Sequence, residues 1–226
     1  MDREDYFTKL YPLQDAVLAS FAGAETEFYL TGGTAASRGY LNHRFSDDLD
    51  LFVNDDSRFG LWADRLIASV ADRPGWDVSV GLRDPRFVRF SVASQGLTLK
   101  IELVNDVPSR VGEVSDHPIL GRLDTAENIL ANKLTALADR EEPKDLADVW
   151  GFCARMGLSL EGALEGAHGK AAGLFPVDLA RPLLSATDSD WKLVRWIEAP
   201  PVEGFLADLR RLGEDLLLLR PREDPS

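Results

Sequence analysis

Residues 32–53, GGTAASRGYLNHRFSDDLDLFV, constrain the fold of this chain more than any other segment. The apolar run at residues 27–30, just before them, predicts a strand. Gly32 and Gly33 allow a sharp backbone turn, and Thr34 is expected to cap the helix that follows. The segment therefore predicts a strand, a glycine turn, a helix and a second strand in direct succession. This order of elements favours a fold that mixes helices with a sheet.

The second of these strands carries two carboxylates on one face. Every second residue from position 49 to 53 is aliphatic, which predicts a strand with one side in the core. Asp48 and Asp50 then project from the other face, about 7 Å apart at the backbone. Carboxylates at that spacing can share hard divalent cations that also bind phosphate oxygens. Asp47 is expected to point to the opposite face.

The glycine turn adds a second functional indication. A strand that ends in Gly32 and Gly33 at the start of a helix presents unpaired backbone N–H groups, and these favour a phosphate group. A Gly-Gly turn alone is usually just a turn, and an Asp-x-Asp pair alone is usually a solvated strand face. Both motifs in adjacent elements, in this order, favour a site that binds a triphosphate and a metal.

These motifs resemble those of a known enzyme family. The GGTA sequence that begins at Gly32, followed by Arg44, Ser46, Asp48 and Asp50 in the pattern R-x-S-x-D-L-D, is similar to the nucleotidyltransferase superfamily that includes DNA polymerase beta. More narrowly, the pattern resembles the AbiEii/AbiGii type of bacterial toxin. The resemblance covers roughly residues 28–150.

A second block, NKLTALADREEPKDLADV at residues 132–149, supports the narrower resemblance. In that family a lysine begins a helix, an arginine follows two turns later, and a basic-Asp-x-x-Asp run opens the next helix. The matching positions here are Lys133, Arg140, Lys144, Asp145 and Asp148.

The basic residues of this block recur at near-helical spacing. Lys133, Arg140 and Lys144 fall on one helix stripe, although Pro143 is expected to start a new helix and break the register. Three cations on one side would suit a phosphate chain. The alternative is a solvated helix face, on which these side chains pair with neighbouring acids, namely Asp139, Glu141 and Glu142.

Two-metal phosphoryl transfer commonly uses a third carboxylate. The strand predicted at residues 97–104, LTLKIELV, places Lys100 and Glu102 on one face, and Glu102 is the candidate metal ligand. The alternative is an exposed glutamate that pairs with Lys100 or with a neighbouring strand. The family resemblance leaves a third possibility, because it also implies a functional aspartate at Asp145 or Asp148.

Composition limits the remaining classes. The chain has 226 residues with 45% hydrophobic content, enough for a globular core, and no apolar run approaches the ~20 residues that span a bilayer. We expect a soluble, cytoplasmic protein without membrane association. The lone Cys153 excludes a disulfide framework and is expected in a helix core. His43 is expected in a surface loop.

The net charge of −13 argues against an extended nucleic-acid surface. Any RNA binding is expected to be local, at basic positions drawn from Arg38, Arg44, Arg83, Arg86, Arg89, Lys100 and Arg110.

The hydrophobic pattern predicts the remaining elements. Helical spacing covers residues 6–21, with a second helix beginning near Pro12, and residues 62–70. Strands are predicted at residues 76–80, 87–92 and 97–104, and helices at residues 129–138, 146–156, 160–167 and 204–218. The fold class is therefore α+β, with a nucleotidyltransferase-like mixed sheet flanked by helices at residues 1–122. A helical C-terminal region at residues 123–226 is expected to complete the active site.

The resemblance implies a metal-dependent nucleotidyltransferase that moves an NMP group from an NTP such as ATP to an acceptor hydroxyl. Two Mg²⁺ ions, with Mn²⁺ as a substitute, would bind Asp48, Asp50 and Glu102. Residues with a catalytic role would be Asp48, Asp50, Lys133, Asp145 and Asp148. Residues that bind the nucleotide would be Gly32, Gly33, Thr34, Arg44, Ser46, Lys133, Arg140 and Lys144.

Three functions remain open from the sequence. The first is a toxin of a toxin–antitoxin system that modifies RNA, with the 3′ end of tRNA as a candidate acceptor and an antitoxin protein as partner. The second is the same chemistry on a small acceptor such as an aminoglycoside, a polycation that suits an acidic protein. The third is a nucleotidyltransferase-like protein that binds without catalysis, which the presence of both Asp48 and Asp50 disfavours.

Overall fold

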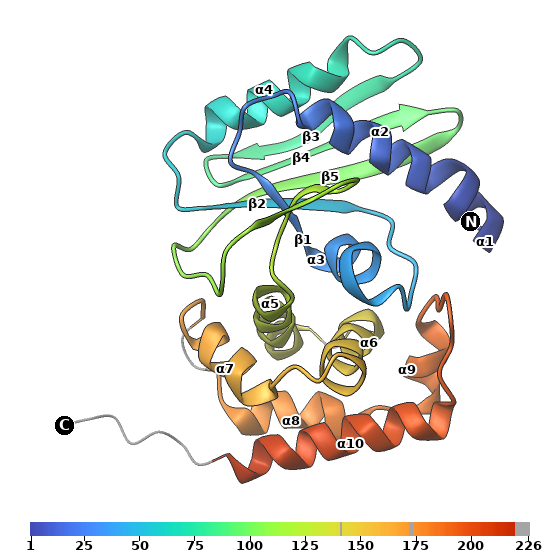
Figure 1. Ribbon diagram of the computed structural model, residues 1–226, viewed down its shortest axis with the longest axis vertical. Helices are drawn as coiled ribbons and strands as arrows, with labels where there is room; N and C mark the ends of the chain where they lie inside the picture. The colour runs from blue at the N-terminus through green and yellow to red at the C-terminus, as the bar shows by residue number, and fades with distance from the viewer. Residues whose placement is uncertain (141, 172–173, 220–226) are drawn as a thin grey trace.

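The computed structural model describes residues 1–140, 142–171 and 174–219, and a mixed seven-stranded sheet forms the centre of this part of the chain (Figure 1). The strand order is β3-β4-β5-β2-β1-β7-β6. The strands are β1 (Tyr29–Thr31), β2 (Leu49–Asn54), β3 (Asp77–Asp84), β4 (Phe87–Ser94), β5 (Leu97–Asp106), β6 (Ser115–His117) and β7 (Gly121–Leu123).

The predicted glycine-turn segment forms the middle of the sheet. The short helix α3 (Gly32–Thr34) follows β1 directly and continues as the π-helical segment η2 (Ala35–Leu41). β1 pairs antiparallel with β2, which places Thr31 opposite Asp50. β2 pairs parallel with β5, which places Asp50 beside Glu102. Three neighbouring strands therefore bring their polar residues to one location.

The N-terminal helices cover the β3–β5 part of the sheet. α1 (Arg3–Asp5), η1 (Tyr6–Leu10) and α2 (Tyr11–Phe21) form a nearly continuous helix, and α2 packs beside α4 (Phe59–Ala71) across the strands (Figure 1). Pro12 lies in the first turn of α2, as predicted, where its missing N–H costs nothing. The apolar faces of these helices and strands share one hydrophobic core.

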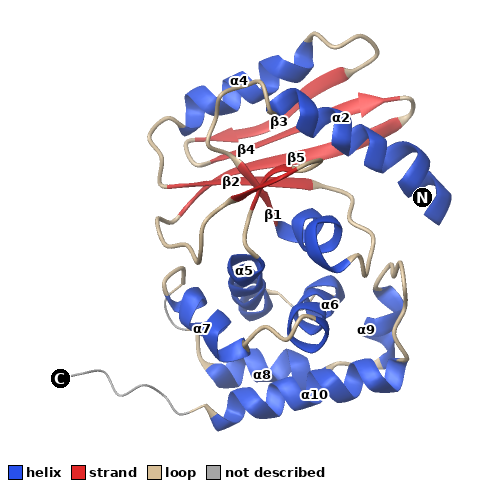
Figure 2. Ribbon diagram, viewed as in Figure 1, coloured by secondary structure: helices blue, strands red, loops and turns tan. Residues whose placement is uncertain are grey.

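Helices make up the C-terminal half and lie against the other end of the sheet layer (Figure 2). They are α5 (Ala126–Asp139), α6 (Pro143–Trp150), η3 (Gly151–Arg155), α7 (Leu160–His168), α8 (Pro176–Ser185), α9 (Asp188–Leu193) and α10 (Val202–Leu218). The Thr125 side chain accepts a hydrogen bond from the Asn128 N–H and caps α5. α6 begins at Pro143, as the sequence predicts.

The α+β class and the principal elements are confirmed, and the differences have local causes. β6 and β7 were not predicted because each has three residues, too few for a periodic pattern. Two helices were also not predicted, namely α8, which contains Pro182, and the six-residue α9. Within the described residues, no helix is both long and apolar enough to cross a membrane.

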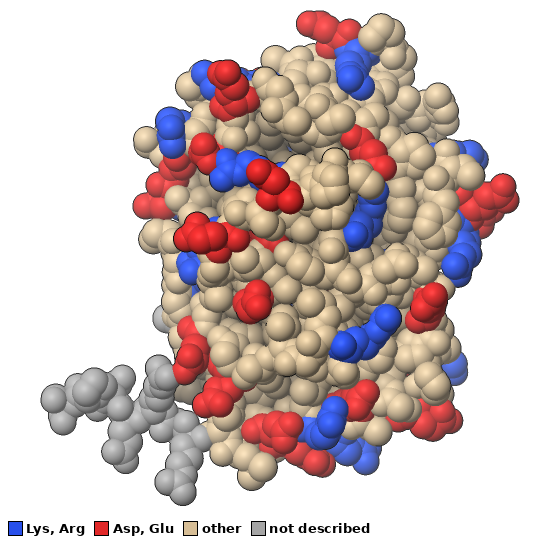
Figure 3. All heavy atoms as spheres, in the orientation of Figure 1, with Lys and Arg blue, Asp and Glu red and all other residues tan. Residues whose placement is uncertain are grey.

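Figure 3 shows acidic and basic side chains interspersed over one face, without a continuous basic area. This agrees with the net charge of −13 and with the expectation that any phosphate binding is local.

Candidate active site

A cavity of about 740 Å³ lies where the central strands face α5 and the start of α6. Its walls include the glycine turn, the acidic residues of β2 and β5, and polar residues of the C-terminal half. The lining residues are Thr31, Gly32, Gly33, Arg44, Ser46, Asp47, Asp48, Asp50, Phe52, Glu102, Val104, Asp106, Ile129, Asn132, Lys133, Thr135, Ala136, Asp139, Arg140, Lys144, Lys170, Ala171 and Arg195.

Both glycines of the turn are required by close neighbours. Gly32 has a φ of +66°, and a Cβ atom there would lie only 2.9 Å from the carboxyl carbon of Asp50. A Cβ atom at Gly33 would lie 2.8 Å from Nη2 of Arg44. The absence of side chains therefore lets the turn approach both a carboxylate and a guanidinium group.

Thr34 does not cap the helix, and that prediction is wrong. The helix begins at Gly32, directly after the extended residue Thr31, so Thr34 lies inside the helix and is fully buried. Its hydroxyl donates to the backbone oxygen of Asp48 at 2.5 Å and lies 3.0 Å from Ser46 Oγ. Thr34 is outside the cavity lining and positions the backbone that carries the acidic residues.

The two predicted aspartates reach the cavity in different electrostatic states. Asp48 Oδ2 pairs with Lys100 Nζ at 2.9 Å. Asp50 has no hydrogen bond or ion pair to any residue that the structure describes. Burial, followed by the charge of Glu102, raises the pKa of Asp50 to about 6. Asp50 is therefore the carboxylate whose ionised form most lacks a positive partner.

Glu102 lines the cavity, and it also makes the ion pairs with Lys100 and with a neighbouring strand that the alternative prediction describes. Its Oε1 atom accepts a hydrogen bond from Arg89 Nε at 2.7 Å and lies 3.3 Å from Lys100 Nζ. Among the described residues, no group of three or more His, Cys, Asp or Glu side chains is arranged to hold a metal ion. Asp48 and Asp50 are oxygen donors with a free face toward the cavity and fit one divalent cation.

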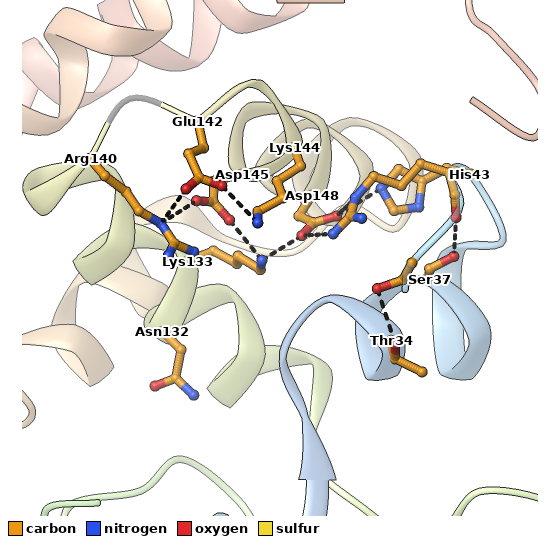
Figure 4. Close-up of polar contacts among 12 residues, drawn as sticks. Thr34, Ser37, His43, Asn132, Lys133, Arg140, Glu142, Lys144, Asp145 and Asp148 are labelled. Carbon is orange, nitrogen blue, oxygen red and sulfur yellow. Dashed lines mark hydrogen bonds and ion pairs between the residues drawn. The ribbon is translucent and has the colours of Figure 1, made fainter. Parts of the chain in front are cut away.

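Lys133 lies on α5 between the two aspartates of α6 (Figure 4). Its Nζ atom is 2.7 Å from Asp145 Oδ1 and 2.7 Å from Asp148 Oδ2, and its side chain is 8% exposed. Burial lowers the pKa of Lys133, but the charges of Asp148 and Asp145 outweigh burial and raise it overall. Lys133 is therefore a fixed positive charge at the cavity wall.

Asp148 joins three segments that are distant in sequence. Its carboxylate accepts two hydrogen bonds from Arg44, each 2.7 Å long. It also pairs with Lys133, as Figure 4 shows. Burial would raise the pKa of Asp148, but Arg44 and Lys133 hold it well below its usual range. Asp145 and Asp148 are both fully buried and outside the cavity lining, so their carboxylates orient the cations of the site.

The prediction that His43 lies in a surface loop is wrong. His43 is fully buried, and its Nε2 atom lies 3.0 Å from Asp148 Oδ1. Burial lowers the pKa of His43 more than Asp148 raises it, so the imidazole is neutral at pH 7. No local pattern indicates this role, because the partner is 105 residues away.

Arg140 and Lys144 line the cavity and also have acidic partners. Arg140 Nε lies 3.1 Å from Asp145 Oδ2, and Lys144 Nζ lies 2.7 Å from Glu142 Oε2. Arg140 and Lys144 therefore show both predicted features, because they face the cavity and also pair with neighbouring acids. Glu141, another predicted partner, lies outside the described residues.

Several lining residues were not selected from the sequence. Arg195 follows α9 and pairs with Asp47 and the hydroxyl of Tyr6. Lys170, only 5% exposed, donates to the backbone oxygen of Ser109 and forms an ion pair with Asp106. Neither Arg195 nor Lys170 belongs to a recognised sequence motif, so only the fold brings these two residues to the cavity.

The charge of the cavity differs from that of the whole chain. The chain has 25 basic and 38 acidic residues, whereas six basic and six acidic residues line the cavity. The basic ones are Arg44, Lys133, Arg140, Lys144, Lys170 and Arg195, and the acidic ones are Asp47, Asp48, Asp50, Glu102, Asp106 and Asp139.

Two solved structures share the fold. The Helicobacter pylori protein JHP933 has a TM-score of 0.61 and 23% identity, and the match covers 92% of both chains. The nucleotidyltransferase toxin MenT4 of Mycobacterium tuberculosis H37Rv has a TM-score of 0.65 and 19% identity, covering 93% of this chain and 84% of MenT4. No curated protein matches the sequence.

The family comparison extends beyond the fold. The model of a family described as nucleotidyl transferase AbiEii toxin, type IV toxin–antitoxin system, matches residues 16–196. This span contains the glycine turn, the acidic strand, and the Lys133 block with its two aspartates. The chain therefore belongs to the AbiEii family of nucleotidyltransferase toxins.

Proposed function

We propose that this nucleotidyltransferase moves an NMP group from an NTP to a hydroxyl of an RNA acceptor, with Mg²⁺ as its metal. The observation that carries the proposal is that Asp48 and Asp50 face the same cavity as the glycine turn at residues 32–33. Lys133 lines that cavity too. A triphosphate needs these three kinds of group together.

Each group has a definite task in the proposed reaction. The backbone at Gly32 and Gly33 approaches the outer phosphates, and the fixed ammonium group of Lys133 balances their charge. Asp48 and Asp50 would hold Mg²⁺, which would supply charge neutralisation at the phosphates and favour ionisation of the attacking hydroxyl. The hydroxyl oxygen attacks the α-phosphorus, and pyrophosphate leaves.

The cavity is less negative than the chain as a whole, which supports an anionic substrate. Six basic residues balance six acidic ones in its lining, whereas the whole chain has a net charge of −13. This supports an NTP and an RNA end over an aminoglycoside acceptor. Membership in a toxin–antitoxin family also supports an antitoxin protein as partner.

Labelling of RNA tests the proposal directly. Purified protein is incubated with each labelled NTP, Mg²⁺ and total bacterial RNA, and the products are separated on a denaturing gel. We expect label on RNA with the wild-type protein and none with Asp48→Ala or Asp50→Ala. Asp64→Ala, which removes a surface ion pair with Arg83, is the matched control and should label RNA normally.

The outcomes separate the candidate functions. Label on RNA that persists in both aspartate variants would contradict the assigned site. If wild-type protein labels no RNA, the RNA acceptor is wrong, and the same assay with aminoglycosides as acceptors tests the small-molecule alternative. The absence of pyrophosphate release with every acceptor would contradict nucleotidyl transfer itself.

A further inference from the structure

Lys100 is a charged residue of the site to which the proposed reaction gives no task. Its Nζ atom lies 2.9 Å from Asp48 Oδ2 and 3.3 Å from Glu102 Oε1. Lys100 and Glu102 are two residues apart on β5, so they project from the same face of the strand. Because β5 pairs with β2, this ammonium group bridges carboxylates from two neighbouring strands.

Glu102 already has a second cation. Arg89 on β4 donates to the same oxygen, Oε1, at 2.7 Å, and the side chain of Glu102 is only 18% exposed. A divalent cation on Glu102 would therefore lie close to two fixed positive charges. Repulsion between cations at such distances in a partly buried site disfavours a metal ion on Glu102.

The remaining donors suffice for one metal ion. Lys100 and Arg89 together balance two of the three negative charges of Asp48, Asp50 and Glu102. Asp50 is the carboxylate without a hydrogen bond or ion pair among the described residues. A single divalent cation shared by Asp50 and the oxygen of Asp48 that Lys100 does not contact would balance the remaining negative charge and leave one positive charge for the phosphates of the nucleotide, whereas a second one needs Glu102 as a third ligand.

We infer that the ammonium group of Lys100 takes the place of the second metal ion, so that the enzyme binds its nucleotide with one divalent cation. This inference rests on the proposed function, because it concerns the same site. Lys100 acts as a positioning residue: it holds Asp48 and Glu102 together and excludes a cation from the space between them. A tethered charge of this kind is in place before the nucleotide arrives.

Counting bound Mn²⁺ tests the inference without reference to turnover. The protein is titrated with Mn²⁺ in the presence of each of the four α,β-methylene NTPs, which cannot transfer NMP, and free Mn²⁺ is measured by electron paramagnetic resonance. We expect one Mn²⁺ per protein–nucleotide complex in the wild type. Lys100→Met removes the ammonium charge and should raise the count to two.

Matched variants separate charge from structure. Lys100→Arg keeps the charge and should keep the count at one. Lys9→Met removes a lysine from a surface pair with Asp5, outside the cavity, and should also leave one. Lys100→Gln is the second neutral variant if Lys100→Met does not fold, as judged by circular dichroism, and it should bind two.

The results distinguish the two proposals. Two Mn²⁺ ions in the wild type, or one in a folded neutral variant of Lys100, would overturn the role of Lys100 while RNA labelling could still succeed. If no analogue binds to the wild-type protein in a manner that Asp50→Ala weakens, the proposed nucleotide site fails, and this inference fails with it.

Discussion

At the scale of single residues, the site depends on two positions that have no side chain, Gly32 and Gly33. The Asp50 carboxyl group and the Arg44 guanidinium group occupy the space that side chains at Gly32 and Gly33 would need. This close packing lets the backbone of the turn border the acidic residues. It also makes the turn intolerant of the smallest substitution.

Gly32→Ala should therefore lose activity as well as stability. Its Cβ would collide with Asp50, and a φ of +66° adds about 1–2 kcal/mol of strain for a residue with a side chain. We expect at least a tenfold loss of RNA labelling, measured together with urea unfolding. Gly96→Ala is the control, since Gly96 has a φ of +78° in open space and should lose stability alone.

The raised pKa of Asp50 predicts that the free energy of unfolding depends on pH in an unusual way. Its pKa of about 6 in the folded protein exceeds the ordinary value of 3.8, so folding favours the protonated form. The resulting stabilisation is full below pH 3.8 and is lost as the pH rises through 6. Asp50→Asn should therefore be more stable than the wild type at pH 8, by roughly 1–3 kcal/mol, and not at pH 4.

Urea unfolding at both pH values measures this difference. Asp48→Asn is the matched control, because it removes a carboxylate that Lys100 already pairs and should give no such gain. A variant Asp50→Asn that is no more stable than the wild type at pH 8 would show that Asp50 has a positive partner after all.

At the scale of elements, Asp148 connects α6 to α5 and to the segment that follows η2. Arg44 and Lys133 both direct their charges at it, and both are buried. In Asp148→Asn the two cations would lose their counter-charge without a change of shape. Removal of one member of a buried ion network typically costs about 3–5 kcal/mol.

We therefore expect Asp148→Asn to lower the free energy of unfolding by about that amount. Asp64→Asn is the control, because Asp64 pairs with Arg83 at the surface and should cost about 1 kcal/mol or less. Equal losses in the two variants, measured by urea unfolding, would contradict the structural role of Asp148. RNA labelling per folded molecule should also fall in Asp148→Asn, because the carboxylate of Asp148 orients Lys133.

The sequence predicted those features of the fold and the site that depend on residues close together in the chain. The alternation from Leu49 onward predicts β2. The Lys133 block was recognised from its resemblance to the AbiEii/AbiGii toxin family. Each of these features lies in one continuous stretch of sequence.

The remainder depends on contacts between distant residues. Arg44 was placed with the nucleotide, but its guanidinium group binds Asp148, 104 residues away. His43 was predicted at the surface, yet the same carboxylate holds it in the core. No pattern near Thr34 reveals that its hydroxyl binds the backbone of Asp48. A sequence shows which residues carry charge, but only the fold decides which charges meet.

At the scale of the whole molecule, the last third of the chain supports the motif segment. Phe45 N donates to Arg195 O, and Ile197 N donates to His43 O, so residues 195–197 run beside residues 43–45. Trp196 lies in this segment and packs against a group of aromatic rings, namely His43, Trp150, Trp191 and Phe205.

Trp196→Ala should weaken both the fold and the site. Loss of a large, mostly buried ring costs about 3 kcal/mol, and the segment that carries Arg195 would lose its anchor. We expect lower urea stability and at least a tenfold loss of RNA labelling per folded molecule. Trp76→Ala, far from the cavity at the start of β3, should lose stability with normal labelling. Normal labelling in Trp196→Ala would contradict this coupling.

The pairing of residues 43–45 with 195–197 has a consequence during synthesis of the protein. Translation delivers the glycine turn and both aspartates first, then Lys133, and then Arg195. A nascent chain therefore carries Asp48 and Asp50 well before the groups that complete the cavity. If the proposed RNA acceptor is correct, the enzyme would in this way stay inactive beside the ribosome's own RNA until residues 195–197 have been made.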